Sequence, residues 1–314
     1  MKNLKKINIY FFGAGNIVEN HIRSFSSYKN ICLFSILSRT PEKANFLKKK
    51  YNIKYVFNNY SEIFKENNNI SVAVIGVSVS STYEVCKSVF KLFDYCLVEK
   101  PAGYNYSEAK KIYLLSKQYK TKAYVALNRR FFFSSINLEL LLRKNNDKRI
   151  VNILDYENSL LNKKLYPKKI INNWMFANSI HLIDYANFLC RGKLILIKKN
   201  LISKKEKLIH LIYSSGDICI YQSIWERPGP WTVSVSTKKE YFKLEPLEDL
   251  SIRNKNSYKY KFIKRDKFDQ IYKPGFYRQA GDFLNAIYGK TNRLVTLEKS
   301  LELMKLISQL YKKK

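Results

Sequence analysis

Residues 7–18, INIYFFGAGNIV, decide the fold of this chain. The first half is a mainly apolar run typical of a β-strand, and the second half is a glycine turn leading into a helix that ends near Phe25. Gly13 permits a tight turn, and Gly15 lets the backbone approach a pyrophosphate at the helix N-terminus. Val18 replaces the third glycine of the dinucleotide fingerprint, so an ordinary strand-to-helix turn is the alternative. The expected cofactor contacts here are Gly13, Gly15, Asn16 and Ile17.

Strand-like and helix-like segments alternate from this turn to about residue 127. Further strands are expected at residues 32–37, 54–57, 72–77, 95–98 and 123–127. Further helices are expected to open at residue 41 and to cover residues 60–67, 83–93 and 107–119. Because helix-length crossovers join parallel strands, residues 1–127 are predicted to form a doubly wound Rossmann domain.

The second predicted strand ends at Ser38 and Arg39, and these two residues bear on the choice of cofactor. NAD sites usually place an acidic residue here for the ribose 2′-hydroxyl, whereas a serine and an arginine suit a 2′-phosphate. We therefore favour NADP(H) over NAD(H), with a solvated loop charge as the alternative role of Arg39. Ser78, in the hydroxyl-rich turn after the strand at 72–77, is a further expected cofactor contact.

Residues 96–103, CLVEKPAG, form a predicted strand end that carries a charged pair. Ligands of open α/β sheets lie beyond the carboxyl ends of the strands, which is where Glu99 and Lys100 stand. Pro101 disfavours the α conformation at Lys100 and keeps its backbone extended. A solvated ion pair is the plain alternative. The neighbouring cofactor signals favour a cofactor contact for Glu99 and a catalytic, substrate-holding amine for Lys100.

Residues 128–314 are predicted to form a second domain, rich in antiparallel strands. Its strands are expected at residues 151–156, 194–199, 208–213, 218–225, 231–236 and 241–244, several of them separated by polar turns. A helix is expected at residues 179–189, another ends near residue 288, and a last one covers residues 297–311.

His181 is the histidine with the clearest chemical role. It lies in the first turn of the helix at 179–189 and shares a face with Asp184 and Tyr185. We favour a catalytic base over a hydrogen-bonded structural histidine, because a neutral imidazole titrates near the working pH. His21 suits a structural place in the first helix, and His210 suits a sheet surface. With three dispersed histidines and five dispersed cysteines, no metal site is expected.

The order of several motifs resembles the Gfo/Idh/MocA oxidoreductases, the family of glucose-fructose oxidoreductase and inositol dehydrogenase. The matching residues are Gly13-Ala14-Gly15 with His21, Ser38-Arg39, Glu99-Lys100-Pro101, Asn128-Arg129-Arg130-Phe131 and His181-Leu182-Ile183-Asp184. The resemblance implies a Rossmann domain, a second domain with a large, open, mainly antiparallel sheet, and last helices that pack back on the first domain. It also implies NAD(P)-linked oxidation or reduction of a sugar, a cyclitol or a nucleotide-linked sugar.

Two positions depart from the family pattern. Ala177 stands where an acid, or sometimes an asparagine, often precedes the histidine, and Asn178 follows it. Val77-Ser78 stands in place of the usual Thr-Pro.

Several further side chains are candidates for binding substrate or cofactor. Arg129 or Arg130 would position the cofactor or an anionic substrate. Residues 225–231, WERPGPW, join two strands, either as an aromatic wall of a sugar site with Arg227 as an anion ligand or as a plain hairpin turn. The expected substrate contacts are Lys100, Arg130, Asn178, Asp184, Arg227 and Tyr277. The remaining expected cofactor contacts are Asn128 and Arg129.

The charge of the chain does not by itself identify a partner. The formal net charge is +32, which would suit nucleic acid or an anionic membrane. The lysines are dispersed, however, and the joint abundance of Lys, Asn, Ile and Tyr is typical of AT-rich coding. We therefore expect neither partner, and no apolar run has the length of a membrane span. Cysteines without a pairing pattern favour a reducing cytoplasm.

These observations predict an NAD(P)-dependent oxidoreductase acting on CH–OH groups. Its expected substrate is a sugar or nucleotide-linked sugar, in surface-glycan biosynthesis, and its expected assembly is a homo-oligomer formed through the C-terminal sheet. The alternative is a non-catalytic sensor of the same fold that binds NADP(H) or a sugar.

Overall fold

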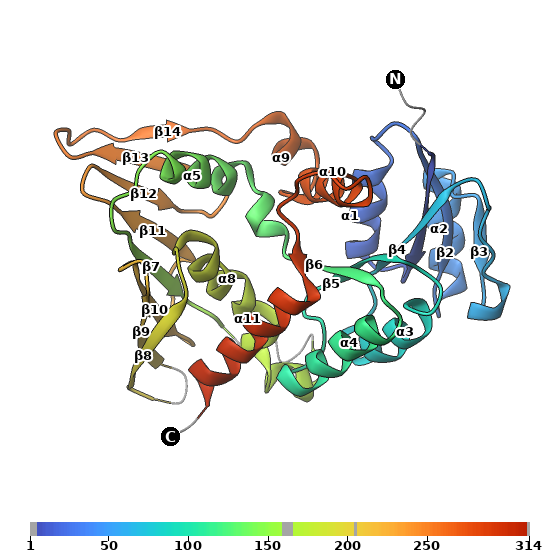
Figure 1. Cartoon of the computed structure of the whole chain (residues 1–314), viewed down its shortest axis with the longest axis horizontal. Helices are drawn as coiled ribbons and strands as arrows, with labels where there is room; N and C mark the ends of the chain where they lie inside the picture. The colour runs from blue at the N-terminus through green and yellow to red at the C-terminus, as the bar shows by residue number, and fades with distance from the viewer. Residues whose placement is uncertain (1–4, 159–165, 204–205, 313–314) are drawn as a thin grey trace. The chain divides into compact units, whose positions relative to one another are not determined.

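The computed structural model describes residues 5–158, 166–203 and 206–312. The chain divides into two compact units (Figure 1). The first consists of Met1–Asn128 with Ile271–Glu302, and the second of Arg129–Gln270 with Leu303–Lys314.

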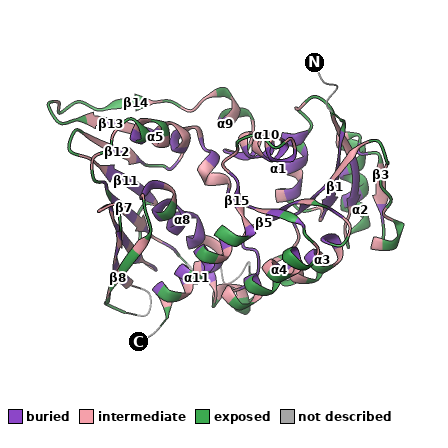
Figure 2. Cartoon of the chain, in the orientation of Figure 1, coloured by how far each residue is buried: buried purple, intermediate pink, exposed green. Residues whose placement is uncertain are grey.

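The first unit is built on a seven-stranded sheet with the order β15-β6-β5-β4-β1-β2-β3. Its strands are β1 (Ile7–Phe12), β2 (Ile31–Leu37), β3 (Tyr55–Phe57), β4 (Ile70–Ile75), β5 (Tyr95–Glu99), β6 (Lys122–Ala126) and β15 (Val295–Thr296). All pairs are parallel except β15 with β6. Strand β1 is buried along its whole length, because it lies in the middle of the sheet (Figure 2). This order is that of a doubly wound Rossmann sheet, as predicted.

Five helices accompany this sheet: α1 (Asn16–Phe25), α2 (Pro41–Tyr51), α3 (Thr82–Val89), α4 (Tyr106–Gln118) and α10 (Phe276–Ile287). Helix α10 packs on α1, where Phe25 and Phe283 meet edge to face with ring centroids 6.1 Å apart. The hydroxyl of Tyr28 donates to the carbonyl oxygen of Tyr277 at 2.8 Å. A C-terminal segment is thereby part of the first unit.

The second unit contains an eight-stranded sheet with the order β14-β13-β12-β11-β7-β10-β9-β8. Its strands are β7 (Ile150–Asp155), β8 (Leu194–Leu201), β9 (Glu206–Tyr213), β10 (Ile218–Ile224), β11 (Thr232–Ser236), β12 (Glu240–Leu244), β13 (Leu250–Asn254) and β14 (Lys261–Ile263). Only β7 and β10 pair in parallel, and the other pairs are antiparallel. The predicted mainly antiparallel sheet is confirmed.

Helices α5 (Phe133–Arg143) and α8 (Ile180–Leu189) pack against one face of this sheet (Figure 1). The short helices α7 (Lys168–Ile171) and α9 (Lys267–Ile271) lie in the connections, and α11 (Leu297–Tyr311) ends the described chain. Alternate residues of β9 are buried and half-buried, so one face of the sheet carries the core of the unit and the other is open.

One local prediction is wrong, and one of two open alternatives is excluded. Residues 60–67 are not an α-helix: only the 3₁₀ turn Tyr60–Glu62 forms, because side chains satisfy the backbone locally. The carboxylate of Glu62 accepts from the amide of Asn58 at 2.8 Å, and Asn59 accepts from the amide of Ser61 at 3.1 Å. Residues 225–231 are not a hairpin, since β7 lies between β10 and β11.

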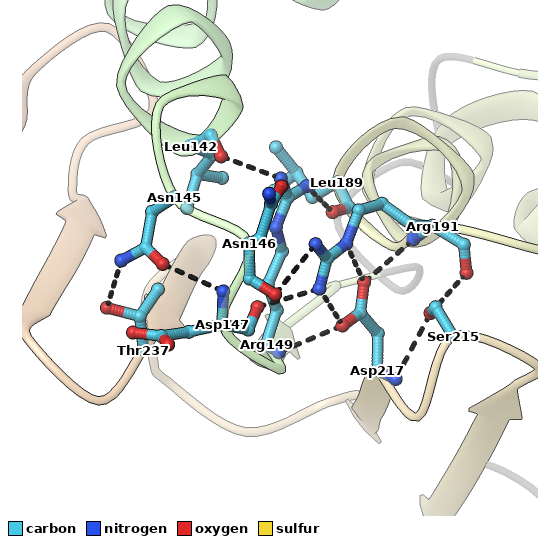
Figure 3. Close-up of polar contacts among 10 residues, drawn as sticks. All are labelled: Leu142, Asn145, Asn146, Asp147, Arg149, Leu189, Arg191, Ser215, Asp217 and Thr237. Carbon is cyan, nitrogen blue, oxygen red and sulfur yellow. Dashed lines mark hydrogen bonds and ion pairs between the residues drawn. The ribbon is translucent and has the colours of Figure 1, made fainter.

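A buried charge network ties together one end of the second unit (Figure 3). Asp217 is fully buried and accepts four hydrogen bonds, three from Arg191 and one from the amide of Arg149. The guanidinium of Arg149 donates to the carbonyls of Leu189 at 2.6 Å and Leu142 at 2.8 Å. The network therefore joins the ends of α5 and α8 to the start of β10. Burial alone would raise the pKa of Asp217, but its hydrogen bonds from Arg191 and the two backbone amides hold that pKa below its usual value.

Candidate functional site

A cavity of about 610 Å³ opens beyond the carboxyl ends of β1, β2 and β4. It lies entirely in the first unit, where an open α/β sheet is expected to bind its ligand. Of the predicted cofactor residues, five line it: Gly13, Gly15, Ser38, Arg39 and Ser78. The sequence reasoning missed Lys43, Asn58, Asn59 and Tyr60, which also line the cavity. These residues lie on α2 or in the turn after β3, and no fingerprint spacing points to them.

The two glycines of the turn are needed for different reasons. Gly13 has a φ of 108°, and a Cβ atom there would lie 2.5 Å from the carbonyl oxygen of Gly76. A Cβ atom on Gly15 would meet no protein atom within 4 Å, and the φ of Gly15 is an ordinary −84°. Gly13 is therefore required by the fold, whereas the open space at Gly15 is room for a ligand at the N-terminus of α1. The donor-rich turn fits a pyrophosphate.

The rim of the cavity after β2 is cationic. Arg39 and Lys43 line it together with the hydroxyls of Ser38 and Thr40, and none of its lining residues carries a carboxylate. Ser38 is bound locally, because its hydroxyl accepts from the amide of Thr40 at 3.2 Å. A cationic, hydroxyl-bearing rim suits an anionic ligand.

Strand β5 ends at the Glu99-Lys100 pair, and the glutamate is held on both carboxylate oxygens. One oxygen lies 2.7 Å from Nε2 of His21, and the other accepts from the amide of Lys100 at 3.1 Å. His21 is buried against the ring of Phe276 with centroids 4.7 Å apart. The Glu99 carboxylate thus links α1 to the strand end that presents Lys100, and Glu99 is not among the cavity-lining residues. The Lys100–Pro101 peptide is cis.

The arginines of residues 128–131 make contacts in the second unit. Arg130 donates twice to Asp184, at 2.5 and 2.6 Å, so two predicted substrate contacts engage each other. Arg129 is half-buried and stacks over the ring of Trp231 at 4.1 Å. Burial lowers the pKa of Arg129. In the first unit, the side-chain amide of Asn128 donates to the carbonyl of Pro274 at 3.0 Å.

The segment before His181 is a π turn, Met175–Ser179, that continues into α8. His181 is buried, and Asn178 in this turn donates to the carboxyl of Glu157 at 2.7 Å. The indole of Trp174 donates to the other oxygen of the same carboxyl at 2.9 Å. Glu157 and Asp155 were missed by the sequence reasoning, because an acid at the end of a strand, or two residues after it, carries no recognisable spacing.

Two further predicted substrate contacts have local partners. Arg227 is exposed and pairs with Glu206 at 2.6 Å. Tyr277 stacks between the rings of Tyr28 and Tyr272, with centroids 4.8 and 5.1 Å away. These contacts account for both side chains without a ligand.

Residues 5–158, 166–203 and 206–312, which the structure describes, hold no group of three or more His, Cys, Asp or Glu side chains arranged to bind a metal ion. Within the same ranges, every helix is too short or too polar to cross a lipid bilayer.

Comparison with known proteins finds a family match for the sequence of the first unit. Residues 7–127 match the GFO_IDH_MocA family, described as an oxidoreductase family with an NAD-binding Rossmann fold. No curated protein matches the sequence.

Solved structures resemble the whole chain in fold. A dehydrogenase from Chromobacterium violaceum has a TM-score of 0.82 at 14% identity, covering 98% of this chain and 95% of that one. Levoglucosan dehydrogenase, in complex with NADH and levoglucosan, has a TM-score of 0.78 at 13% identity, with 98% and 96% covered. The UDP-N-acetylglucosamine 3-dehydrogenase GnnA of Acidithiobacillus ferrooxidans has a TM-score of 0.72 at 13% identity, with 97% and 96% covered. At these identities the likeness establishes the fold.

The two glycines of the turn should respond differently to the same substitution. We expect G15A to keep the thermal stability of the wild type but to weaken NADPH binding by roughly tenfold or more, because a methyl group displaces a backbone–phosphate contact. G13A should instead lower the melting temperature, because a Cβ atom there clashes with the backbone of Gly76. Calorimetric titration and thermal melts measure both. Wild-type affinity in a folded G15A variant would contradict the assignment.

Proposed function

We propose, on the premise that this chain belongs to the Gfo/Idh/MocA oxidoreductases, that it transfers a hydride between a nicotinamide and a CH–OH carbon of a sugar or nucleotide-linked sugar. The observation that carries the proposal is the cavity at the glycine turn of a Rossmann unit whose sequence matches that family. Two relatives in fold are, by their descriptions, dehydrogenases of levoglucosan and of UDP-N-acetylglucosamine, which supports this substrate class. A role in surface-glycan biosynthesis follows from the same class and is part of the proposal.

The proposed chemistry needs a base and a cation at one oxygen. A bound nicotinamide would supply the hydride acceptor. In the proposal, a ring nitrogen of His181 takes the hydroxyl proton as the carbonyl forms, and returns it in the reducing direction. The proposed role of the Lys100 ammonium is to stabilise the negative charge that develops on the substrate oxygen. Glu99, bound to His21 and to the amide of Lys100, would keep the lysine in place.

Replacing Lys100 should lower the rate of the reaction without weakening cofactor binding. We expect K100M to lower turnover by at least about a hundredfold, since a removed transition-state donor costs that much. NADPH binding should stay near that of the wild type. The assay is NADPH oxidation with a panel of keto-sugars, or NADP⁺ reduction with the corresponding alcohols, followed by absorbance at saturating cofactor.

Lys110, on the exposed face of α4, provides a matched control, because K110M removes the same charge from the same unit. Unchanged turnover in K100M would remove the lysine from the mechanism. If the wild type binds NADPH and turns over no substrate, the alternative of a non-catalytic sensor is favoured.

We also propose NADP(H) as the preferred cofactor, since Arg39 and Lys43 line the cavity and no carboxylate does. R39A should lower NADPH affinity by roughly tenfold or more, because a charge-assisted hydrogen bond to the 2′-phosphate is lost. NADH affinity should change little. K48A, which removes a charge from an exposed position of α2, is the control. Equal losses for NADH and NADPH in R39A would contradict the preference.

The open face of the second sheet is the proposed surface of homo-oligomerisation. It carries partly exposed apolar side chains on neighbouring strands, among them Ile150, Ile220, Ile212 and Leu196. Burying such a face against a second copy removes apolar surface from water. Sedimentation at micromolar concentration should therefore give a multiple of the 37.1 kDa chain mass, and I220K should reduce that multiple. A monomeric wild type would contradict this assembly.

A further inference from the structure

The buried side chains of β7 change from apolar to acidic at the carboxyl end of the strand. Val151 and Ile153 are fully buried apolar side chains of the core. Asp155, the last residue of β7, continues this alternation, and Glu157 follows the strand by two residues; both are also buried. Two buried carboxyl groups thus lie two residues apart at the end of the strand that packs against α8. Buried acids of this kind need specific partners.

Glu157 is fixed by two segments of the second unit. Its carboxyl group accepts from Trp174 and from Asn178, and its backbone carbonyl accepts from the amide of Glu226 at 2.7 Å. The partners come from the segment before α8 and from the segment after β10. Since β7 and β10 are parallel neighbours, the carboxyl lies where both strands end.

The contact with Asn178 brings this acid to the helix that carries His181. Asn178 is in the π turn Met175–Ser179, and α8 follows it without a break. Residues three apart in such a helical segment lie on the same face, so Asn178 and His181 are neighbours on one side of it. Position 177, where the family pattern often has an acid, is an alanine. Instead, Glu157, which follows β7, contacts the same turn through Asn178.

The surroundings of Glu157 favour its protonated form at neutral pH. Burial, and then the carboxyl of Asp155, raise its pKa to about 8, although Trp174, Asn178 and the Arg129 guanidinium all act to lower it. The pKa of Asp155 is raised as well, by burial, against the hydrogen bonds from Tyr221 and Trp225 and the charge of Arg129. A proton on Glu157 is therefore released just above neutrality, beside the turn that precedes His181.

We propose that Glu157 is the acidic positioning residue of the His181 site, acting through Asn178 in place of the acid that Ala177 does not supply. The inference rests on the proposed function, in which His181 exchanges a proton with the substrate. Glu157 holds the π turn in place through Asn178, and it adds a negative charge near the imidazole once it ionises. Its substitution should change both the geometry and the pH response of the histidine.

The first test reads the titration without any substrate. The chain has three tryptophans and three histidines, so indole N–H and imidazole signals are few enough to assign with W174F and H181N. In NMR spectra recorded from pH 6 to 9.5, the Trp174 indole and the His181 ring should both shift with a midpoint near 8.

Two variants decide whether Glu157 causes that step. E157Q keeps the shape of the side chain and should abolish the step at both residues. The exchange variant E157Q/N178D keeps one acid and one amide in the pair and should restore a step at the His181 ring. A step at His181 that survives in E157Q, or its absence from the wild type while Trp174 titrates, would overturn the inference.

The second test follows turnover. E157Q should lower kcat by roughly tenfold or more with an unchanged KM for NADPH, and the exchange variant should recover most of the loss. Wild-type kcat and pH profile in E157Q would overturn the inference while leaving the proposed function intact. If no keto-sugar is reduced by the wild type, the proposed function fails, and the NMR titration still decides whether Glu157 acts on His181.

Discussion

The close approach of two backbones at the glycine turn is the constraint on which the nucleotide-binding unit depends. The turn after β1 comes so near the end of β4 that neither Gly13 nor Gly76 has room for a side chain. A Cβ atom on Gly76 would lie 2.4 Å from a methyl carbon of Val18, the residue that replaces the third fingerprint glycine. The valine is thus accommodated by a glycine on the neighbouring strand, and the turn keeps its shape. This contact sets the edge of the cavity and leaves Gly15 open towards it.

Several of the few acidic side chains of this basic protein make buried contacts that join segments of the chain. There are 25 acids against 57 Lys and Arg, and buried acids of this kind occur in both units of the described structure. Glu99 joins α1 to the end of β5, Asp184 holds Arg130, and Asp217 ties Arg191 to the start of β10. Breaking the Arg130–Asp184 pair would leave an uncompensated buried charge, which costs about 3–5 kcal/mol. The cavity rim, by contrast, carries cations and no acid, which suits a ligand that brings its own negative charge.

The sequence predicted those features that local chemistry determines. The alternation of apolar strands and helices gave the Rossmann order, and the glycine turn and Arg39 were found because their types and positions follow strand ends. Side chains brought to the cavity by tertiary packing, such as Lys43 and Tyr60, carry no such mark. The helix expected at residues 60–67 failed because Asn58, Asn59 and Glu62 satisfy the backbone through side-chain bonds. The order β11-β7-β10 was also beyond reach, since local pattern does not say which strands pair.

Glu157 shows why an incomplete motif is weak evidence of a missing function. A family pattern records residues along the chain, whereas a proton needs neighbours in space. The parallel pairing of β7 and β10 places the ends of two strands beside the turn that leads into α8. An acid on either strand end can therefore serve a group on that helix as well as one in the preceding turn. Trp174 and Asn178, both from the preceding segment, fix its carboxyl, so the position is as closely defined as one within the helix would be. If Glu157 has the proposed role, the alanine at position 177 marks an acid that has moved to another segment, and the sensor alternative loses the one sequence feature that supports it.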